Sequence, residues 1–207
     1  MSDAGPFIGV SQKRPTIFAR EDTRLYTAFT VLELLVVITI IVILAGLILA
    51  TTGYVEKKGA RSRAESEIAA ISAALESYKA DNGIYPSDAA TTDQLDPTSN
   101  VNPSATPVPN VYTKASLYLY KQLSGDPTGS RQPSGKSYLA FRPNMLLPAP
   151  PSNATVIAIR DPFGNSYGYS TMKASNPNNN GYNPTYDLWS TAGGTGSSDV
   201  PGWIKNW

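Results

Sequence analysis

The sequence contains no cysteine among its 207 residues. This absence excludes disulfide bonds, thiolate ligands for zinc or iron–sulfur clusters, and thiol nucleophiles. Histidine is absent too, which excludes a Ser-His-Asp triad, imidazole metal ligands and the usual general base near neutral pH. An enzyme built on Asp, Glu, Lys or Tyr alone is the catalytic alternative that the composition leaves open.

The sequence also lacks a large excess of either charge. Its 17 basic residues nearly balance its 16 acidic ones and leave a net charge of +1. Such a chain has no overall field that would attract a polyanion. The sequence shows no P-loop, no Gly-rich phosphate cradle and no basic strip interleaved with aromatic residues. We therefore expect no nucleic-acid partner.

What the chain does have is one long apolar run, FTVLELLVVITIIVILAGLILA, from Phe29 to Ala50. A helix needs about 20 mostly apolar residues to span a bilayer. The run contains a single charged residue, Glu33, and a carboxylate at the centre of a bilayer costs roughly 2.5–3.5 kcal/mol on insertion scales. Glu33 is therefore a candidate functional residue that needs a partner.

Residues 1–28 are polar, mixed in charge and without helical or strand periodicity. They differ from a secretory signal peptide, whose apolar region spans only about 7–15 residues before a cleavage site. The simplest interpretation is a signal-anchor helix behind a cytoplasmic tail. Charge does not choose its orientation, because four basic residues precede the run and four follow it closely: Lys57, Lys58, Arg61 and Arg63.

Helical character continues beyond the apolar run. An apolar face recurs at spacings of three and four residues, and Asn82-Gly83 followed by Pro86 provides a stop signal. The pattern predicts one helix from about Phe29 to Asp81, apolar all round in its first half and amphipathic in its second. The apolar face comprises Ile68, Ile71, Leu75 and Tyr78, and the polar side carries the i,i+4 pairs Arg61–Glu65 and Arg63–Glu67.

The composition changes after about residue 86, where proline, glycine, serine and asparagine become frequent. The segment 117–123 is short and apolar, and both helix and strand remain open for it. Alternating β-branched and aromatic residues predict a small sheet, and we expect its strands to pair in antiparallel fashion. The predicted strands are 137–142, 155–160, 166–170 and 186–190, and Asp161–Asn165 is a predicted turn.

The last third of the chain is rich in tyrosine and tryptophan, among them Tyr167, Tyr169, Tyr186, Trp189, Trp203 and Trp207. Aromatic side chains can form a stacking platform for bases or sugars. Core packing and strand pairing are their commoner roles, and we expect these roles here.

At its front end the sequence resembles a known family. Ala28-Phe-Thr-Val-Leu-Glu33 is similar to the processing and methylation motif of type IV pilins and type II secretion pseudopilins. YKADNGIYP (78–86), DPFGNSYGY (161–169), YDLWS (186–190) and the final Asn206-Trp207 resemble the major pseudopilin type more narrowly.

The resemblance implies an α+β fold of lollipop shape, in which a long N-terminal helix packs on a small antiparallel sheet. It divides the chain into a leader peptide (1–28), a transmembrane and filament-core half of the helix (29–50), an amphipathic half (51–86) and a globular periplasmic head (87–207).

The resemblance also implies processing and assembly. A prepilin peptidase would cut between Ala28 and Phe29, and the new Phe29 amine would be methylated and keep its charge. Glu33 would pair with that amine on an adjacent subunit and set the register of packed helices. The alternative is that Glu33 is a first-turn residue that favours the positive end of its own helix.

Calcium is the one cofactor that the resemblance implies, because the C-terminal loop of major pseudopilins binds it. Calcium prefers six to eight oxygen ligands. Asp199 matches one acidic position of that loop, whereas the expected Asp-Gly pair is replaced by Thr191-Ala-Gly-Gly194. Asp187 is the other candidate ligand. Both residues could equally be ordinary strand-end and loop residues.

The expected function is structural. Subunits would form a periplasmic pseudopilus that helps to export proteins, starting from a single-pass precursor in the bacterial inner membrane. The expected partners are further copies of the chain, the peptidase, minor pseudopilins, an inner-membrane platform and an ATPase. Two alternatives stay open: a type IV or minor pilin, and a signal-anchored periplasmic binding domain that does not polymerise.

Overall fold

The computed structural model describes residues 29–207, without the side chains of residues 50–52. The predicted leader and Ala28 lie outside the described residues. The chain divides into two units, one ending at Ile48 and one from Leu49 to Trp207, and each is described by itself.

Helix α1 comprises Val31–Asn82, close to the predicted span of 29–81. In the first unit its apolar side chains are exposed all round, from 83% for Val31 to 45% for Val37. Thr30 and Glu33 form a reciprocal cap at its first turn. This part of α1 therefore has no hydrophobic face directed at a core of its own.

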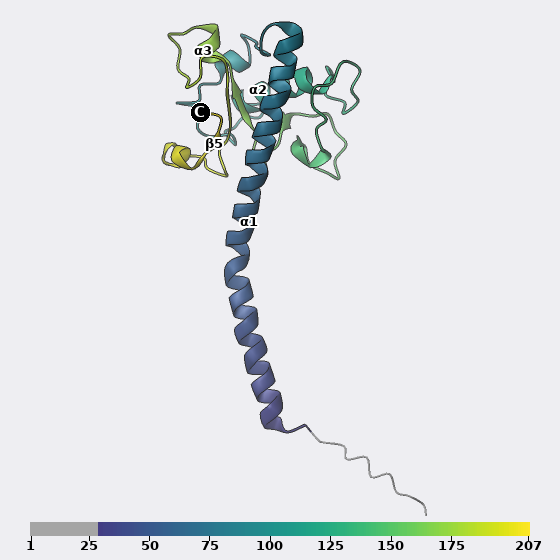
Figure 1. Cartoon of the computed structure of the whole chain (residues 1–207), viewed down its shortest axis with the longest axis vertical. Coiled ribbons are helices and arrows are strands. Elements are labelled where there is room, and N and C mark those ends of the chain that lie inside the picture. The colour runs from purple at the N-terminus through teal and green to yellow at the C-terminus, as the bar shows by residue number, and fades with distance from the viewer. Residues whose placement is uncertain (1–28) are drawn as a thin grey trace, which may run out of the picture. The chain divides into compact units, whose positions relative to one another are not determined.

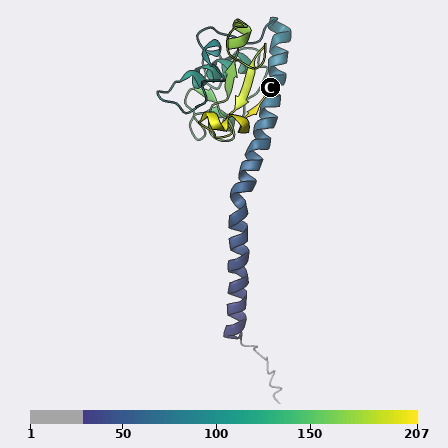
Figure 2. The same ribbon diagram turned by 90° about the vertical axis from the view of Figure 1, so that its left-hand side faces the viewer.

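In the second unit α1 is amphipathic, as predicted. Ala64, Ile68, Ile71, Ala74 and Leu75 are buried, at the three- and four-residue spacing of one helix face. Figure 2 shows the rest of this unit lying on one side of that part of α1. The helix ends at the predicted stop signal, where the N–H of Gly83 donates to the carbonyl of Lys79 at 2.7 Å.

Helix α2 comprises Val111–Ser124, which resolves the alternative left open for 117–123 in favour of helix. Asn110 caps its start, since its Oδ1 accepts from the N–H of Thr113 at 2.9 Å. Gly125 ends it with a φ of 72°, in the left-handed region that favours glycine. Helix α2 packs against strands β2 and β3, and Figure 1 shows it beside α1.

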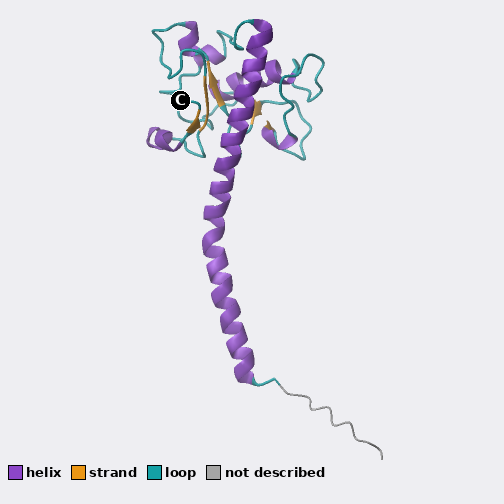
Figure 3. Cartoon of the chain, in the orientation of Figure 1, coloured by secondary structure: helices purple, strands orange, loops and turns teal. Residues whose placement is uncertain are grey.

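In the described part of the chain, five short strands form two antiparallel sheets. Strand β1 (Leu146–Leu147) pairs with β2 (Ala158–Ile159). The second sheet has the order β3-β4-β5, with β3 at Gly168–Ser170, β4 at Asp187–Ser190 and β5 at Ile204–Lys205. Loops make up much of the unit (Figure 3), and they contain the short helices η1 (Thr92–Gln94), η2 (Pro143–Met145), α3 (Met172–Ser175) and η3 (Ser197–Gly202).

The sheet predictions have mixed outcomes. Strands β2, β3 and β4 confirm three predicted strands in shortened form, whereas the predicted strand 137–142 is wrong. There the N–H groups of Tyr138 and Leu139 both donate to the carbonyl of Leu123 at the end of α2, at 2.8 and 3.0 Å. The segment is an extended loop, and β1 follows it at Leu146 instead.

The aromatic residues form the core, as expected. Tyr167, Tyr169 and Trp189 are fully buried. The rings of Trp189 and Trp203 stack with centroids 5.8 Å apart, and Trp189 Nε1 donates to the Tyr112 hydroxyl at 3.1 Å. A Cβ at Gly168 would lie 2.2 Å from the Trp189 ring, so this pairing position requires glycine.

Candidate functional site

The apolar part of α1 is the first candidate site. The run is apolar over more than 18 residues, and none of its most apolar stretch is buried within the chain. The core helix of a soluble protein would be mostly buried, so length and composition identify a segment that can cross a membrane. An exposed apolar surface of this extent requires lipid or another protein around it.

Glu33 lies in the first turn of α1. Its Oε2 accepts from the backbone N–H and the hydroxyl of Thr30, both at 3.0 Å, and the hydroxyl of Thr30 accepts from the N–H of Glu33 at 3.1 Å. This is a capping box, with the Thr-x-x-Glu spacing visible in the sequence. Glu33 was predicted as a candidate residue from its charge, whereas its capping box with Thr30 was not predicted.

The cap uses only one of the two carboxylate oxygens of Glu33, Oε2. Within residues 29–207, no donor lies within hydrogen-bonding distance of Glu33 Oε1. Phe29 is nearby in sequence and 76% exposed. The single chain therefore explains how Glu33 starts the helix and leaves one oxygen available to a further donor.

Asp187, a predicted calcium ligand, lies at the first residue of β4 and is buried. Its Oδ2 accepts from the N–H of Tyr182 at 2.9 Å, and its Oδ1 accepts from the N–H of Asn183 at 2.8 Å. Burial raises the pKa of Asp187, and these backbone hydrogen bonds oppose the rise. Both carboxylate oxygens of Asp187 therefore hold the loop that precedes β4.

Asp199, the other predicted calcium ligand, lies in η3, beyond the opposite end of β4. Its Oδ2 accepts from the N–H groups of Thr195 and Gly196, both at 3.0 Å. Strand β4 separates the two carboxylates, since Asp187 pairs with Ser170 and Ser190 pairs with Ile204 at the other end.

The donor set therefore does not fit the predicted pair. Three acidic side chains do not gather at a common point anywhere in the described part of the chain. Asp199 closes its own loop through backbone amides, as Asp187 does, and this matches the alternative in which both are strand-end and loop residues. A calcium site that includes Asp187 and Asp199 together stays a prediction, and we derive no step through it.

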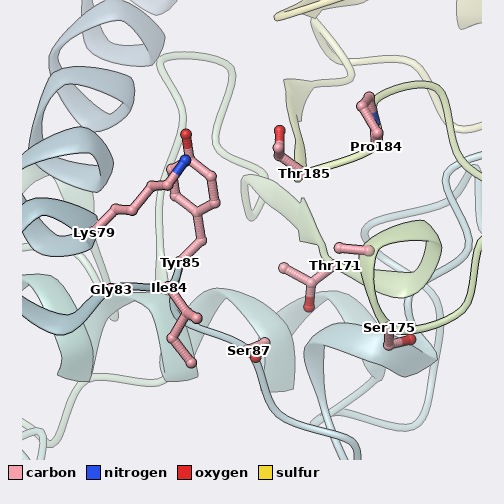
Figure 4. A pocket seen from close by; sticks show the side chains of 10 residues that line it. Lys79, Gly83, Ile84, Tyr85, Ser87, Thr171, Ser175, Pro184 and Thr185 are labelled. Atoms are coloured by element: carbon pink, nitrogen blue, oxygen red, sulfur yellow. The ribbon is translucent and has the colours of Figure 1, made fainter.

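A second kind of candidate is the hollow of about 300 Å³ at the C-terminal end of α1 (Figure 4). Lys79 and Tyr85 lie side by side in it, with the Lys79 Nζ 4.5 Å from the ring centroid. Across the hollow, the Thr171 hydroxyl lies within hydrogen-bonding distance of two acceptors, the Thr92 hydroxyl at 2.7 Å and the Asp93 carboxylate at 2.6 Å. The lining thus presents a cation–π pair and a hydroxyl that is hydrogen-bonded to a neighbouring hydroxyl and carboxylate.

Two buried carboxylates that sequence reasoning missed hold loops in place. Asp161 opens the predicted turn, and its Oδ2 accepts from the Ser190 hydroxyl of β4 at 2.5 Å. Burial raises the pKa of Asp161 against the effect of its hydrogen bonds. Asp126 accepts four backbone N–H groups, from residues 128, 129, 130 and 131, and these bonds together with side-chain donors lower its pKa although burial opposes them.

Taken together, an exposed apolar helix that continues into an amphipathic helix, and a small antiparallel sheet with α2, define a pilin-like α+β protein. The distinguishing residues are those of the front motif, Phe29 to Glu33.

Comparison with known proteins defines the family. The model of the family "Type II secretion system (T2SS), protein G" matches residues 53–133. The type II secretion system core protein G of Aeromonas hydrophila is 40% identical over 108 residues, which cover 52% of this chain and 71% of that protein. The same protein of Vibrio cholerae is 36% identical over 108 residues, with coverages of 52% and 68%.

The corresponding Pectobacterium carotovorum protein is 36% identical over 102 residues, and the match spans 62% of its length and 49% of this chain. No solved structure gives a significant match. The chain belongs to the protein G family of the type II secretion system, the family of the major pseudopilin. It is a pseudopilin subunit of type II secretion, and its apolar helix is suited to anchor it in a membrane.

Proposed function

We propose that this chain is made as a membrane-inserted precursor and becomes the main structural subunit of a pseudopilus that drives protein export. The precursor is cut between Ala28 and Phe29, and the Phe29 amine is methylated. The observation that carries the proposal is the exposed apolar surface of residues 29–49 with a single carboxylate, Glu33, in its first turn.

Filament packing supplies what this surface lacks. Side chains of neighbouring helices would cover the apolar residues once the subunit leaves the bilayer. A carboxylate in such surroundings needs a cation, and the amine of Phe29 on an adjacent subunit is available after cleavage. Glu33 Oε2 can keep its bonds to Thr30 while Oε1 accepts from that amine, so the cap and the pairing are compatible.

The proposal includes a location and a set of partners. The precursor spans the bacterial inner membrane once, with residues 87–207 in the periplasm, and the filament is periplasmic. A prepilin peptidase, minor pseudopilins, an inner-membrane platform and a cytoplasmic ATPase act with it. The role is structural and requires no catalysis by the chain itself.

Three variants separate the two roles of Glu33. Glu33→Gln retains the capping box, because glutamine also caps at this position, but removes the charge. Thr30→Ala removes the cap and retains the charge. Glu33→Ala removes both. Each is expressed with the secretion machinery, and filaments are counted after shearing or by electron microscopy, with membrane extraction as the control for insertion.

We expect Glu33→Gln and Glu33→Ala to abolish assembly while insertion is retained, because an uncharged side chain cannot pair with the amine. Thr30→Ala should still assemble, with about 1 kcal/mol less helix stability from the lost cap. Normal filaments from Glu33→Gln, together with failure of Thr30→Ala, would assign Glu33 to the cap alone.

Mass spectrometry of the mature N-terminus tests the processing step. A chain that begins with methylated Phe29 is expected. An intact leader on assembled or mature protein would contradict the proposal and favour the signal-anchored binding domain. Filaments on the cell surface would instead favour a type IV or minor pilin.

A further inference from the structure

A basic hollow lies in the second unit, just after the apolar run. Its volume is about 690 Å³. Its lining combines Tyr54, Lys57, Lys58 and Arg61 of α1 with Phe163 of a loop and Gly202 at the end of η3. A volume of this size is within the range of small-ligand sites. Three cations and two aromatic rings point to an anionic ligand with an apolar part.

The three cations differ in whether the chain itself supplies them with a hydrogen-bond or ion-pair partner. Arg61 is fixed, since its Nη1 donates to the carbonyl of Gly202 at 2.9 Å and its Nε lies 3.4 Å from Glu65. Among the described residues, Lys57 and Lys58 have no carboxylate within 4 Å. Both lysines are exposed, so their charges are available to a ligand.

The distance along the helix places this hollow at the level of lipid headgroups. At 1.5 Å per residue, Tyr54 lies about 6 Å beyond Ala50 and Lys58 about 12 Å beyond it. Each headgroup layer is roughly 5–7 Å thick, and lysine side chains reach back along a helix toward it. Tyrosine is favoured at the same interface.

The lysines also have no explanation in topology. Positive charges after a first membrane helix oppose the positive-inside signal when that side faces away from the cytoplasm. In the proposed orientation, Lys57 and Lys58 are on that opposing side. Attraction to anionic headgroups offers a physical reason for keeping them there, at roughly five-fold in affinity for each basic residue near the surface.

We propose that this hollow binds the phosphate of an anionic lipid headgroup in the unassembled precursor and thereby sets the depth of α1 in the bilayer. The aromatic side chains of Tyr54 and Phe163 would contact the glycerol and upper acyl region, which free phosphate lacks. This inference depends on the membrane insertion of the proposed function, but not on cleavage or assembly.

The test uses the full chain in a neutral detergent, with phosphatidylglycerol or phosphatidylcholine added and binding measured by native mass spectrometry. The variant is Lys57→Gln/Lys58→Gln. The control is Arg63→Gln/Lys114→Gln, which removes the same charge from exposed positions outside the hollow. Circular dichroism checks that both retain their fold, and Lys57→Arg/Lys58→Arg should preserve binding.

We expect preferential binding of phosphatidylglycerol, weakened about five-fold per lysine and about 25-fold in the double variant, with little change in the control. Equal losses in variant and control would overturn the site in favour of general electrostatics, and so would equal binding of the two lipids. Competition by inorganic phosphate as strong as by lipid would overturn the lipid assignment. Membrane extraction of the same proteins shows separately whether insertion, and with it the proposed function, has failed.

Discussion

The two parts of helix α1 place similar residues in opposite surroundings. Ile41 in the first unit is 58% exposed, whereas Ile71 in the second is fully buried among side chains of α2 and the sheets. An isoleucine that the chain itself covers contributes to folding. One that the chain leaves uncovered is available to lipid or to another subunit, as the proposed function requires.

The carboxylates of α1 differ in the same way. Among residues 29–207, the hydrogen-bond donors to the Glu33 carboxylate both come from Thr30 in its own first turn. Glu67 is half-buried, and its Oε2 accepts from the hydroxyl of Tyr167, 100 residues further along the chain, at 2.8 Å. The tertiary structure therefore supplies a donor to Glu67, whereas in the described residues Glu33 Oε1 keeps an oxygen that the proposed pairing would use.

The largest contrast is expected from one substitution made in both parts. Ile71→Ala should lower the free energy of unfolding of the second unit by about 2–5 kcal/mol, through lost burial and the cavity left behind. Ile41→Ala removes the same atoms from an exposed position and should leave that free energy unchanged. Chemical denaturation followed by near-UV circular dichroism of the aromatic core measures both.

If Ile41→Ala destabilised the second unit as much as Ile71→Ala does, the division into a folding part and a contact part would be wrong. Ile41→Ala should instead weaken filament packing, which the yield of sheared filaments reports.

Tyr167→Phe sharpens the comparison of the carboxylates. The substitution leaves Glu67 half-buried without its hydroxyl donor, and we expect a loss of about 1–3 kcal/mol in the free energy of unfolding. Burial raises the pKa of Glu67 and the Tyr167 hydrogen bond lowers it, so the pKa should rise further in the variant. Denaturation and carboxyl NMR titration measure the two effects.

Tyr54→Phe is the matched control, because the Tyr54 side chain is 71% exposed. A loss in Tyr54→Phe as large as in Tyr167→Phe would mean that the hydroxyl bond to Glu67 contributes nothing specific.

Local patterns in the sequence predicted helix α1 better than the sheet, and they left α2 undecided. The apolar run, the face that includes Ile71 and the Asn82-Gly83 stop are contained in neighbouring residues, and α1 follows them closely. The alternation in 137–142 suggested a strand, but Tyr138 and Leu139 donate to Leu123. Alternation shows that a segment is extended and half-buried, and it does not identify its hydrogen-bond partner.

The prediction of functional and buried polar residues had the same limit, because sequence patterns report neighbours along the chain. Glu33 was found because a charge in an apolar run is conspicuous in the sequence alone. The interaction of Glu67 with Arg63 at i,i+4 was expected, and Arg63 does lower the pKa of Glu67, but the hydrogen bond that Glu67 accepts comes from Tyr167. Asp161 and Ser190 are 29 residues apart and meet only through the sheet. Side-chain partners brought together by tertiary structure leave no spacing from which to predict them.

Acid should act on the second unit through Asp126. Its pKa is lowered from the ordinary value of 3.8, so below about pH 4 the unfolded chain binds this proton more readily than the folded one. Its contribution to stability is therefore present above that pH and is lost as the pH falls through the lowered pKa. Asp126→Asn should reduce the slope of unfolding free energy against pH in this range.

Asp161 should have the opposite effect on the pH dependence of stability. Burial raises its pKa, so the folded state holds this proton more tightly, and its contribution to stability falls as the pH rises through the raised pKa. Asp161→Asn should leave the acid-side loss in place. An acid slope that is unchanged in Asp126→Asn would exclude Asp126 as its source.

The smallest effect is expected at the surface of α1, where Glu65 pairs with Arg61 at 3.4 Å and both side chains are about half exposed. Glu65→Gln should cost at most about 0.5 kcal/mol, because solvent and salt screen such a pair. Arginine precedes glutamate here, which is the weaker order on a helix, and Arg61 keeps its bond to the Gly202 carbonyl. Denaturation at low and high salt measures the difference, with the exposed Glu56→Gln as control. A loss above 1 kcal/mol that persists in high salt would show that polar contacts on the exposed face of α1 stabilise the fold as its buried face does, and the contrast between the two surfaces would then need revision.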